Sequence, residues 1–130
     1  MKVLGLMISN GLVGLSGGQR QALTLLMATM KRPRLLLLDE HTAALDPKTA
    51  AKVLALSDRF VEEGRLTTLM VTHNMKDAIA HGNRLIMMNA GKIVLDISGE
   101  EKKRLTVDDL LHAFTLSTAE EFANDRILLS

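Results

Sequence analysis

The chain has 130 residues, a length that fits one domain of ordinary size. Its 16 Lys and Arg residues nearly balance 15 Asp and Glu residues, and no block of like charges occurs, which argues against a nucleic-acid partner or an anionic lipid surface. Cysteine is absent, which excludes disulfides and thiolate metal sites. No apolar run approaches the roughly 20 residues that a membrane-spanning helix requires.

The N-terminal residues 1–8 combine one positive charge with an apolar stretch, as a signal peptide would. The stretch, residues 3–8, is shorter than the apolar region of a signal peptide. We therefore expect no secretion signal and a location in the cytosol.

From Leu15 onward, segments typical of helices alternate with segments typical of strands, and this alternation predicts an α/β fold. Ser16 and Gln19 have the form of a capping box, which opens an apolar-rich helix that runs to about Met30. Residues 35–38 are all leucine and predict a short strand that is buried on both faces of a parallel sheet.

The middle of the chain predicts a second helix and a second strand. Asp46 followed by Pro47 is typical of a helix N-terminus, and Gly64 is expected to cap the helix end. Residues 67–72 are β-branched and apolar and predict another buried strand. Asn74 is expected to cap a short helix that ends at Gly82.

The last third of the chain predicts a hairpin followed by helices. Residues 84–88 and 92–97 flank a turn at residues 89–91, so we expect a hairpin at the edge of the sheet. Two small helices are expected to follow, one over residues 106–114 and one from Ser117 onward with its own capping box.

The first candidate site is the start of the first predicted helix. A helix N-terminus with Gly17 and Gly18 lets backbone amides approach an anion closely, and Ser16 adds a hydroxyl donor. The alternative is an ordinary well-capped helix, because capping boxes are common.

Two adjacent acids form the second candidate site. Asp39 ends an apolar strand, where a carboxylate is costly unless it pairs with a cation. Glu40 follows it and has the chemistry to orient and polarise an attacking water. The alternative is that both acids are solvated residues that cap the following turn.

Three further residues each have an ordinary structural explanation. His73 follows the second predicted strand, where a lone histidine is usually structural. Asp46 needs no purpose beyond capping the helix that Pro47 begins. His41 is interpreted as an exposed loop histidine with no catalytic role.

Over about residues 13–97, the order of these segments resembles the nucleotide-binding domain of ABC-type ATPases. Residues 15–19 resemble the LSGGQ signature, residues 35–40 the Walker B strand with its catalytic glutamate, and residues 44–46 the D-loop. His73 resembles the histidine of the H-loop. A signature followed by an apolar strand that ends in Asp-Glu is a highly specific pairing.

The resemblance implies a partial P-loop NTPase fold, with a mostly parallel sheet flanked by helices and an edge hairpin. Residues 1–130 would be the C-terminal portion of one nucleotide-binding domain. Residues 1–32 would be a remnant of its helical subdomain, and residues 33–130 would run from Walker B to the end of the catalytic core.

The resemblance also implies ATP and Mg²⁺ as cofactors, with Glu40 and His73 as catalytic residues and Asp39 holding Mg²⁺ through water. Asp46 would lie at a dimer interface. The signature would contact the γ-phosphate of a nucleotide held by the opposite subunit, through Ser16, Gly17, Gly18 and Gln19.

The sequence departs from the family pattern in three places. His41 stands where many members carry proline or alanine, and Ala43 where the D-loop usually has serine. No GxxxxGK[ST] loop occurs, because the only Gly-Lys pair is Gly91-Lys92 and Ile86 stands at the place of the first glycine. We therefore interpret the chain as truncated, inactive alone, and left with an open apolar sheet edge.

The expected function is that of an ATP-hydrolysing subunit that energises transport by an ABC transporter. Its partners would be a second ATPase subunit and a transmembrane permease, at the inner face of the cell membrane, and an unfused subunit favours a bacterial importer. One alternative is an inactive interaction module that supplies the signature to a partner ATPase. Another is a DNA-organising ATPase, which would need long heptad segments or a basic face, and neither is present.

Overall fold

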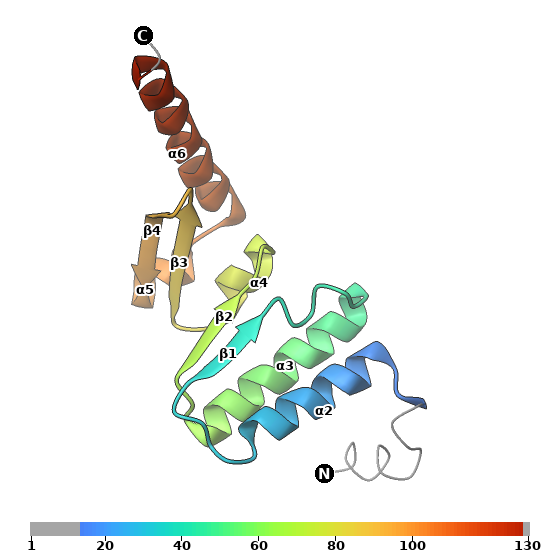
Figure 1. Cartoon of the computed structure of the whole chain (residues 1–130). Coiled ribbons are helices and arrows are strands. Elements are labelled where there is room, and N and C mark those ends of the chain that lie inside the picture. Colours follow the sequence, from blue (N-terminus) through green and yellow to red (C-terminus); the bar gives the residue numbers. More distant parts are fainter. Residues whose placement is uncertain (1–13, 129–130) are drawn as a thin grey trace. The chain divides into compact units, whose positions relative to one another are not determined.

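The computed structural model describes residues 14–128, except for the side chains of Asp125 and Leu128. The N-terminal residues 1–8, the stretch compared above with a signal peptide, lie outside that range. The chain divides into two compact units, of which the first ends at Thr72 and the second begins at His73. Figure 1 shows the elements of both, and the architecture is mixed α/β as expected.

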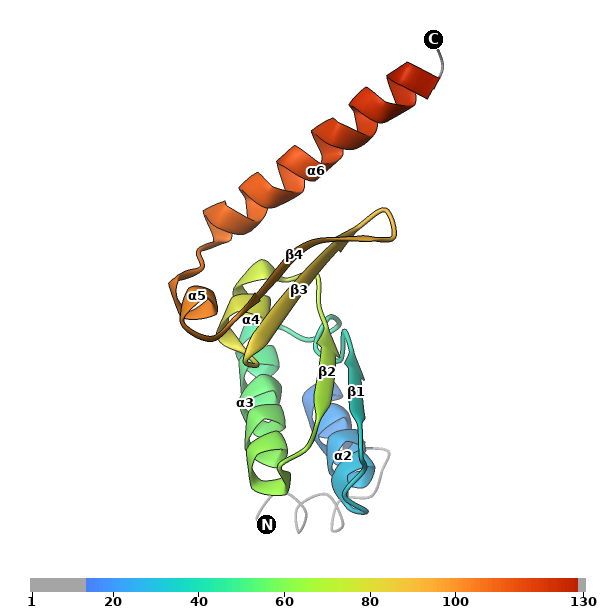
Figure 2. The same ribbon diagram turned by 90° about the vertical axis from the view of Figure 1, so that its left-hand side faces the viewer.

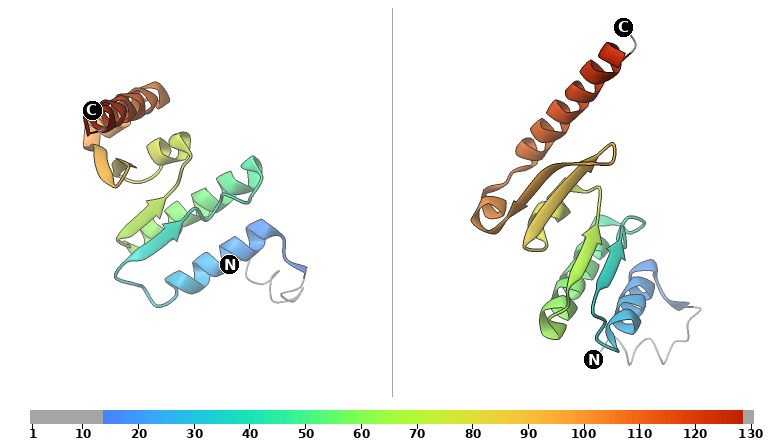
Figure 3. Two further views of the ribbon diagram at one scale, coloured as in Figure 1. Left: turned by 45° about the horizontal axis from the view of Figure 1, so that its top comes forward. Right: turned by 60° about the vertical axis from the view of Figure 1, so that its left-hand side comes forward.

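The first unit pairs two helices with two strands. Its elements in chain order are α2 (Gly17–Thr29), β1 (Leu36–Asp39), α3 (Pro47–Gly64) and β2 (Thr68–Val71). The strands are parallel, with Leu36 opposite Thr68 and Asp39 opposite Val71, and α3 makes the crossover between them. Figures 2 and 3 show α2 and α3 packed on one side of this strand pair.

Leucines from the strands and from α2 form the core of the first unit. Its fully buried members are Leu25, Leu36 and Leu38, and half-buried side chains of α3 and β2 pack against them. On the opposite face of the strand pair, Leu37 is 63% exposed and Leu69 is 54% exposed. The prediction that this strand is buried on both faces is therefore wrong for the described residues, because the helices of this unit cover only one face.

The turn from α3 to β2 depends on Gly64, the last residue of α3. The left-handed residue that ends the helix is Arg65, with φ of 48°, and not Gly64 as the sequence predicted. A Cβ atom on Gly64 would lie 2.9 Å from Cγ of Leu66. Gly64 therefore leaves room for Leu66 to fold back and pack against the core.

The second unit contains a hairpin and three helices. Its elements are α4 (Met75–Ala80), β3 (Arg84–Asn89), β4 (Lys92–Ser98), α5 (Gly99–Arg104) and α6 (Val107–Leu128). The hairpin strands are antiparallel and form a two-stranded sheet of their own in the described residues, with a bulge between Met87 and Met88. Two small sheets thus replace the single, mostly parallel sheet that we expected, because among the described strands β1 pairs only with β2 and β3 only with β4.

The helix α5 was missed by the sequence analysis, since residues 99–104 contain no apolar side chain. It is held by Lys102, which is only 5% exposed. The Lys102 Nζ atom donates to the carbonyl oxygens of Ile79 at 2.5 Å and His81 at 3.0 Å, at the end of α4. Burial lowers the pKa of Lys102.

The helix α6 is continuous, so the prediction of two small helices is wrong. The hydroxyls of Ser117 and Thr118 donate back to the carbonyl oxygen of Phe114, at 2.7 and 3.0 Å, and do not cap a new helix. The predicted start is confirmed, because the amide of Asp109 donates to Thr106 Oγ1 and the amide of Thr106 donates to Asp109 Oδ2.

Candidate functional site

The N-terminus of α2 is organised by the predicted capping box. The Gln19 amide donates to Ser16 Oγ at 3.3 Å, and the Ser16 amide donates to Gln19 Oε1 at 3.0 Å. These two bonds fix the entry into the helix, so that Gly17 and Gly18 occupy its first turn. Amides of a first turn have no carbonyl acceptor within their own helix, and they carry the positive end of the helix dipole.

Gly18 has a second role that the sequence did not indicate. It is buried, and a Cβ atom there would lie 2.3 Å from Thr49 Cγ2 in the first turn of α3. A Cβ atom on Gly17 would lie 3.2 Å from Leu45 Cδ2. The two glycines therefore let the N-termini of α2 and α3 approach each other closely, and the signature residues lie beside the start of α3.

Asp46 caps α3 as predicted. Its Oδ2 atom accepts a hydrogen bond from the Thr49 amide at 3.0 Å, and its carbonyl accepts one from the Ala50 amide at 2.8 Å. Hydrogen bonds from Thr49, from its side chain first and then its backbone, lower the pKa of Asp46. Capping thus accounts for an aspartate here, and a further role at a dimer interface stays a prediction.

Asp39 and Glu40 lie at the carboxyl end of β1, and both are exposed. The sequence analysis expected Asp39 to need a cation because a buried carboxylate is costly. In the described part of the chain Asp39 is in contact with solvent, so that reason for a cation does not apply. Its oxygen atoms remain suitable ligands for Mg²⁺, which usually binds one or two carboxylates together with water and phosphate oxygens. Among residues 14–128 no group of three or more acidic or histidine side chains is placed to hold a metal ion by itself.

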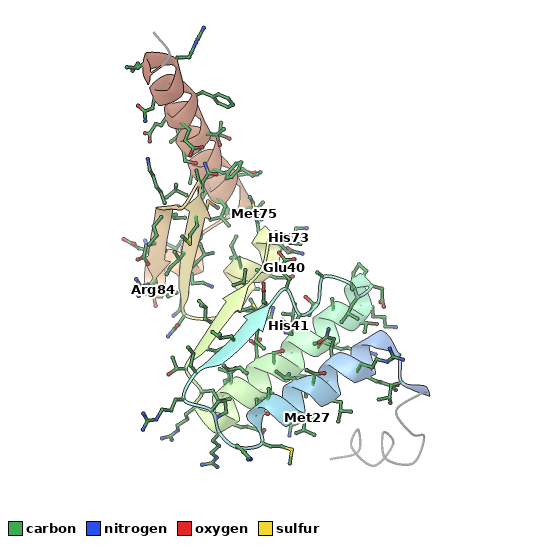
Figure 4. All side chains as sticks on the ribbon, viewed as in Figure 1. Met27, Glu40, His41, His73, Met75 and Arg84 are labelled. Atoms are coloured by element: carbon green, nitrogen blue, oxygen red, sulfur yellow. The ribbon has the colours of Figure 1, made fainter. Side chains whose placement is uncertain are left out.

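Glu40 has a strained backbone. Its φ angle is 45°, in the left-handed region that favours glycine. Its amide donates to the Val71 carbonyl at 2.8 Å and its own carbonyl accepts from the Ala43 amide at 3.1 Å. Backbone strain of this kind is frequent at functional sites. Figure 4 shows Glu40 and His41 where the chain leaves β1.

His41 is bound to α3, a contact that the sequence analysis missed. Its Nε2 atom lies 2.9 Å from Oγ of Ser57, and Ser57 is only 3% exposed. One signal was present, because Ser57 lies four residues after Val53 on the stripe that α3 buries. The Ser57 hydroxyl donates to the Val53 carbonyl within the helix, and its oxygen has lone pairs left for a second partner, which is His41.

His73 is the first residue of the second unit, where it is exposed. The next residue, Asn74, caps α4 as predicted, with its Oδ1 atom accepting from the amides of Lys76 at 3.0 Å and Asp77 at 3.3 Å. The structure thus brings residues 16–19 beside the start of α3 and places Asp39 next to Glu40 in the first unit. The second unit holds His73.

No helix among the described residues is both long and apolar enough to cross a membrane.

Comparison with known sequences identifies a family of similar proteins. The sequence model of the ABC transporter family matches residues 4–43, a segment that contains Ser16, Gly17, Gly18, Gln19, Asp39 and Glu40. The chain belongs to the family of ABC transporter ATP-binding proteins.

Individual relatives carry transport names. The chain is 56% identical over 100 residues to the tyrosine transport ATP-binding protein of Clostridioides difficile. These 100 residues are 77% of this chain and 40% of that protein. It is 46% identical over 82 residues to the aliphatic sulfonates import ATP-binding protein SsuB 1 of Burkholderia cenocepacia, covering 63% of this chain and 26% of that protein. The chain thus spans less than half the length of these curated relatives.

Proposed function

We propose that the chain provides the signature helix and the water-activating acids of an ATP-hydrolysing subunit in an ABC importer. The observation that supports this most is the pairing of two features in one unit. A capped helix N-terminus carries residues 16–19, and a strand end carries Asp39 and Glu40. The family match spans both features.

The N-terminus of α2 is proposed to bind the γ-phosphate of a nucleotide held by the opposite subunit. The capping box supports this role, because it uses Ser16 Oγ as an acceptor and leaves the hydroxyl proton to be donated. The first-turn amides and the helix dipole favour an anion at the same end. The residues would be Ser16, Gly17, Gly18 and Gln19.

Asp39 and Glu40 are proposed to divide the work of hydrolysis. Asp39 would hold Mg²⁺ through water, and the ion would neutralise charge on the phosphates. Glu40 would orient and polarise the attacking water, which needs a carboxylate that is accessible, as the Glu40 side chain is.

His73 and Asp46 are proposed to act as the H-loop histidine and the D-loop aspartate. His73 would donate a hydrogen bond to the γ-phosphate and so respond to its presence. Asp46 would keep its capping bond to Thr49 while it faces the second subunit.

The proposed partners are a second ATPase subunit and a transmembrane permease, at the inner face of the cell membrane. The names of the relatives favour import of a small organic solute. Identity is higher to the tyrosine transport protein than to the sulfonate import protein, so an amino acid is the proposed cargo class.

The proposal is tested in a chimera. The 100-residue stretch of the Clostridioides difficile relative that matches this chain is replaced by the matching residues of this chain. ATP hydrolysis is then measured with Glu40→Gln and with Glu62→Gln, an exposed glutamate of α3, as the matched control. Glu40→Gln should lower turnover at least about 100-fold without loss of nucleotide binding, because it removes the base that positions water. Turnover that survives Glu40→Gln, or that Glu62→Gln abolishes equally, removes Glu40 from the mechanism.

A further inference from the structure

The contact between His41 and Ser57 joins the turn after β1 to the middle of α3. The two residues are 16 positions apart, and His41 Nε2 lies 2.9 Å from Ser57 Oγ. Ser57 is only 3% exposed, so water has little access to its end of the bond.

The direction of the bond follows from the serine. The Ser57 hydroxyl has one proton, and its Oγ atom donates to the Val53 carbonyl at 2.9 Å. Ser57 Oγ therefore accepts from His41, and Nε2 of His41 carries a proton. Both the neutral Nε2–H tautomer and the imidazolium form meet this requirement, so the bond does not depend on the charge of the ring.

The residue before His41 is the one whose backbone is strained. Glu40 has φ of 45°, and its amide and carbonyl are bonded to Val71 and Ala43. Such a conformation persists only where the surrounding structure determines it from several sides. The His41–Ser57 bond fixes the chain immediately after Glu40, and the bond to Val71 fixes it at Glu40 itself.

We propose that His41 is a positioning residue: through Ser57 it anchors the turn after β1 on α3 and holds Glu40 in its left-handed conformation. The anchoring follows from the geometry alone. Its meaning for catalysis rests on the proposed function, in which the Glu40 carboxylate orients water.

The test uses the full chain and four variants. His41→Ala and Ser57→Ala each remove the bond. His41→Gln supplies an uncharged Nε2–H donor at a similar reach, and His112→Ala removes an exposed histidine of α6 as the matched control. Amide hydrogen exchange is followed by NMR at Glu40 and Ala43, and at Phe60 and Val61 in α3 to measure the stability of the whole unit.

We expect the amides of Glu40 and Ala43 to exchange about tenfold faster, relative to those of α3, in His41→Ala and Ser57→Ala, since about one hydrogen bond is lost locally. His41→Gln and His112→Ala should keep the wild-type ratio. An unchanged ratio in His41→Ala, or a loss that His41→Gln does not rescue, overturns the proposal.

A second measurement needs no variant and so does not depend on how the variants fold. The ¹⁵N spectrum of the histidine rings in the wild-type chain should show a protonated Nε2 in His41 at neutral and at mildly alkaline pH. A neutral ring with its proton on Nδ1 would overturn the proposal.

The catalytic consequence is measured separately in the chimera. His41→Ala should lower kcat about tenfold with KM unchanged, and His41→Gln should restore it. If Glu40→Gln leaves turnover intact while the exchange results hold, the proposed function fails and the anchor stands. If Glu40→Gln abolishes turnover while His41→Ala changes neither exchange nor kcat, the anchor fails and the function stands.

Discussion

Gly18 lies so close to Thr49 that a Cβ atom on the glycine would be 2.3 Å from the Thr49 Cγ2 atom. We expect Gly18→Ala to lower the free energy of unfolding by about 1 kcal/mol, because an overpacking cost of about 1–3 kcal/mol outweighs the gain of about 1 kcal/mol in helix propensity. Adding Thr49→Ser should restore stability, since it removes Cγ2 and keeps the hydroxyl. Urea unfolding of the single and double variants measures both effects.

The matched control for this prediction is Gly17→Ala. A Cβ atom there would lie 3.2 Å from Leu45 Cδ2, the end of a flexible side chain that can move aside. Gly17→Ala should therefore be neutral or stabilising. Equal losses at the two glycines, or no recovery with Thr49→Ser, would contradict the close approach of α2 and α3.

The hairpin turn has an alanine where glycine fits better. Ala90 and Gly91 have φ angles of 46° and 75°, the pair of positive values that a type I′ turn requires. We expect Ala90→Gly to raise the free energy of unfolding by about 1 kcal/mol, because a left-handed conformation costs a residue with a Cβ atom about that much. Gly91→Ala should lower it. Thermal unfolding of the two variants measures both effects. Melting temperatures that shift in the same direction in both variants would contradict the assignment of a type I′ turn.

Asp46 is expected to make the free energy of unfolding decrease as the pH falls into the acid range. Its pKa is lowered in the folded state, so its contribution to stability is present above the ordinary aspartate pKa and is lost as the pH falls through the lower folded value. Asp46→Asn keeps an uncharged cap and should flatten the loss of stability between about pH 5 and pH 2. Asp46→Ala removes the cap and should lower the melting temperature at every pH. The free energy of unfolding is measured by urea titration at several pH values in this range. If Asp46 contributes nothing, it will depend on pH in Asp46→Asn as steeply as in the wild type.

The exposed face of the parallel strand pair should make the isolated chain associate. Leu37 and Leu69 are opposite each other in the register, and both are more than half exposed. Parallel strands are usually covered on both faces, and large exposed apolar patches promote association. Sedimentation should show association that rises with concentration and that falls in a Leu37→Thr, Leu69→Thr variant, but not in Met27→Gln on α2. A monodisperse monomer with a sharp, cooperative thermal transition would contradict this expectation.

The 130-residue chain by itself should show no measurable ATP hydrolysis. Its sequence contains no GxxxxGK[ST] run, and it is the amides and lysine of that loop that cradle the phosphates of a nucleotide. Phosphate release from the purified chain is the measurement. Turnover that Glu40→Gln abolishes would contradict the expectation, whereas turnover that survives Glu40→Gln would indicate a contaminating enzyme.

Local chemistry made much of the fold predictable. Ser16, Asp46 and Asn74 cap the helices that the sequence assigned to them, because a cap depends on residues only two or three positions away. The helix α5 was missed since its residues lack apolar periodicity, and it is stabilised by the contact of Lys102 with α4, more than 20 positions away. The exposure of Leu37 was also missed, since a run of leucines does not reveal which face the surrounding chain covers.

In the candidate site, too, features that depend on adjacent residues were predicted, and contacts between distant residues were not. The capping box at α2 and the acids at the end of β1 were predicted, because motifs of adjacent residues carry them. The approach of Gly18 to Thr49 and the bond between His41 and Ser57 were not, since both join residues that are distant in sequence and depend on how α3 packs. One signal was present in the buried stripe of α3, where Ser57 is a polar residue among apolar ones.

The left-handed backbone of Glu40 sets the stability of the fold against the role proposed for its carboxylate. A glycine there would relax the chain and make the unit easier to fold, yet it would delete the carboxylate. Selection for thermal stability alone would therefore favour glycine at position 40, whereas selection for hydrolysis would favour glutamate if its carboxylate orients water as proposed above. A library randomised at this codon and sorted under the two regimes would separate what the fold prefers from what the reaction demands.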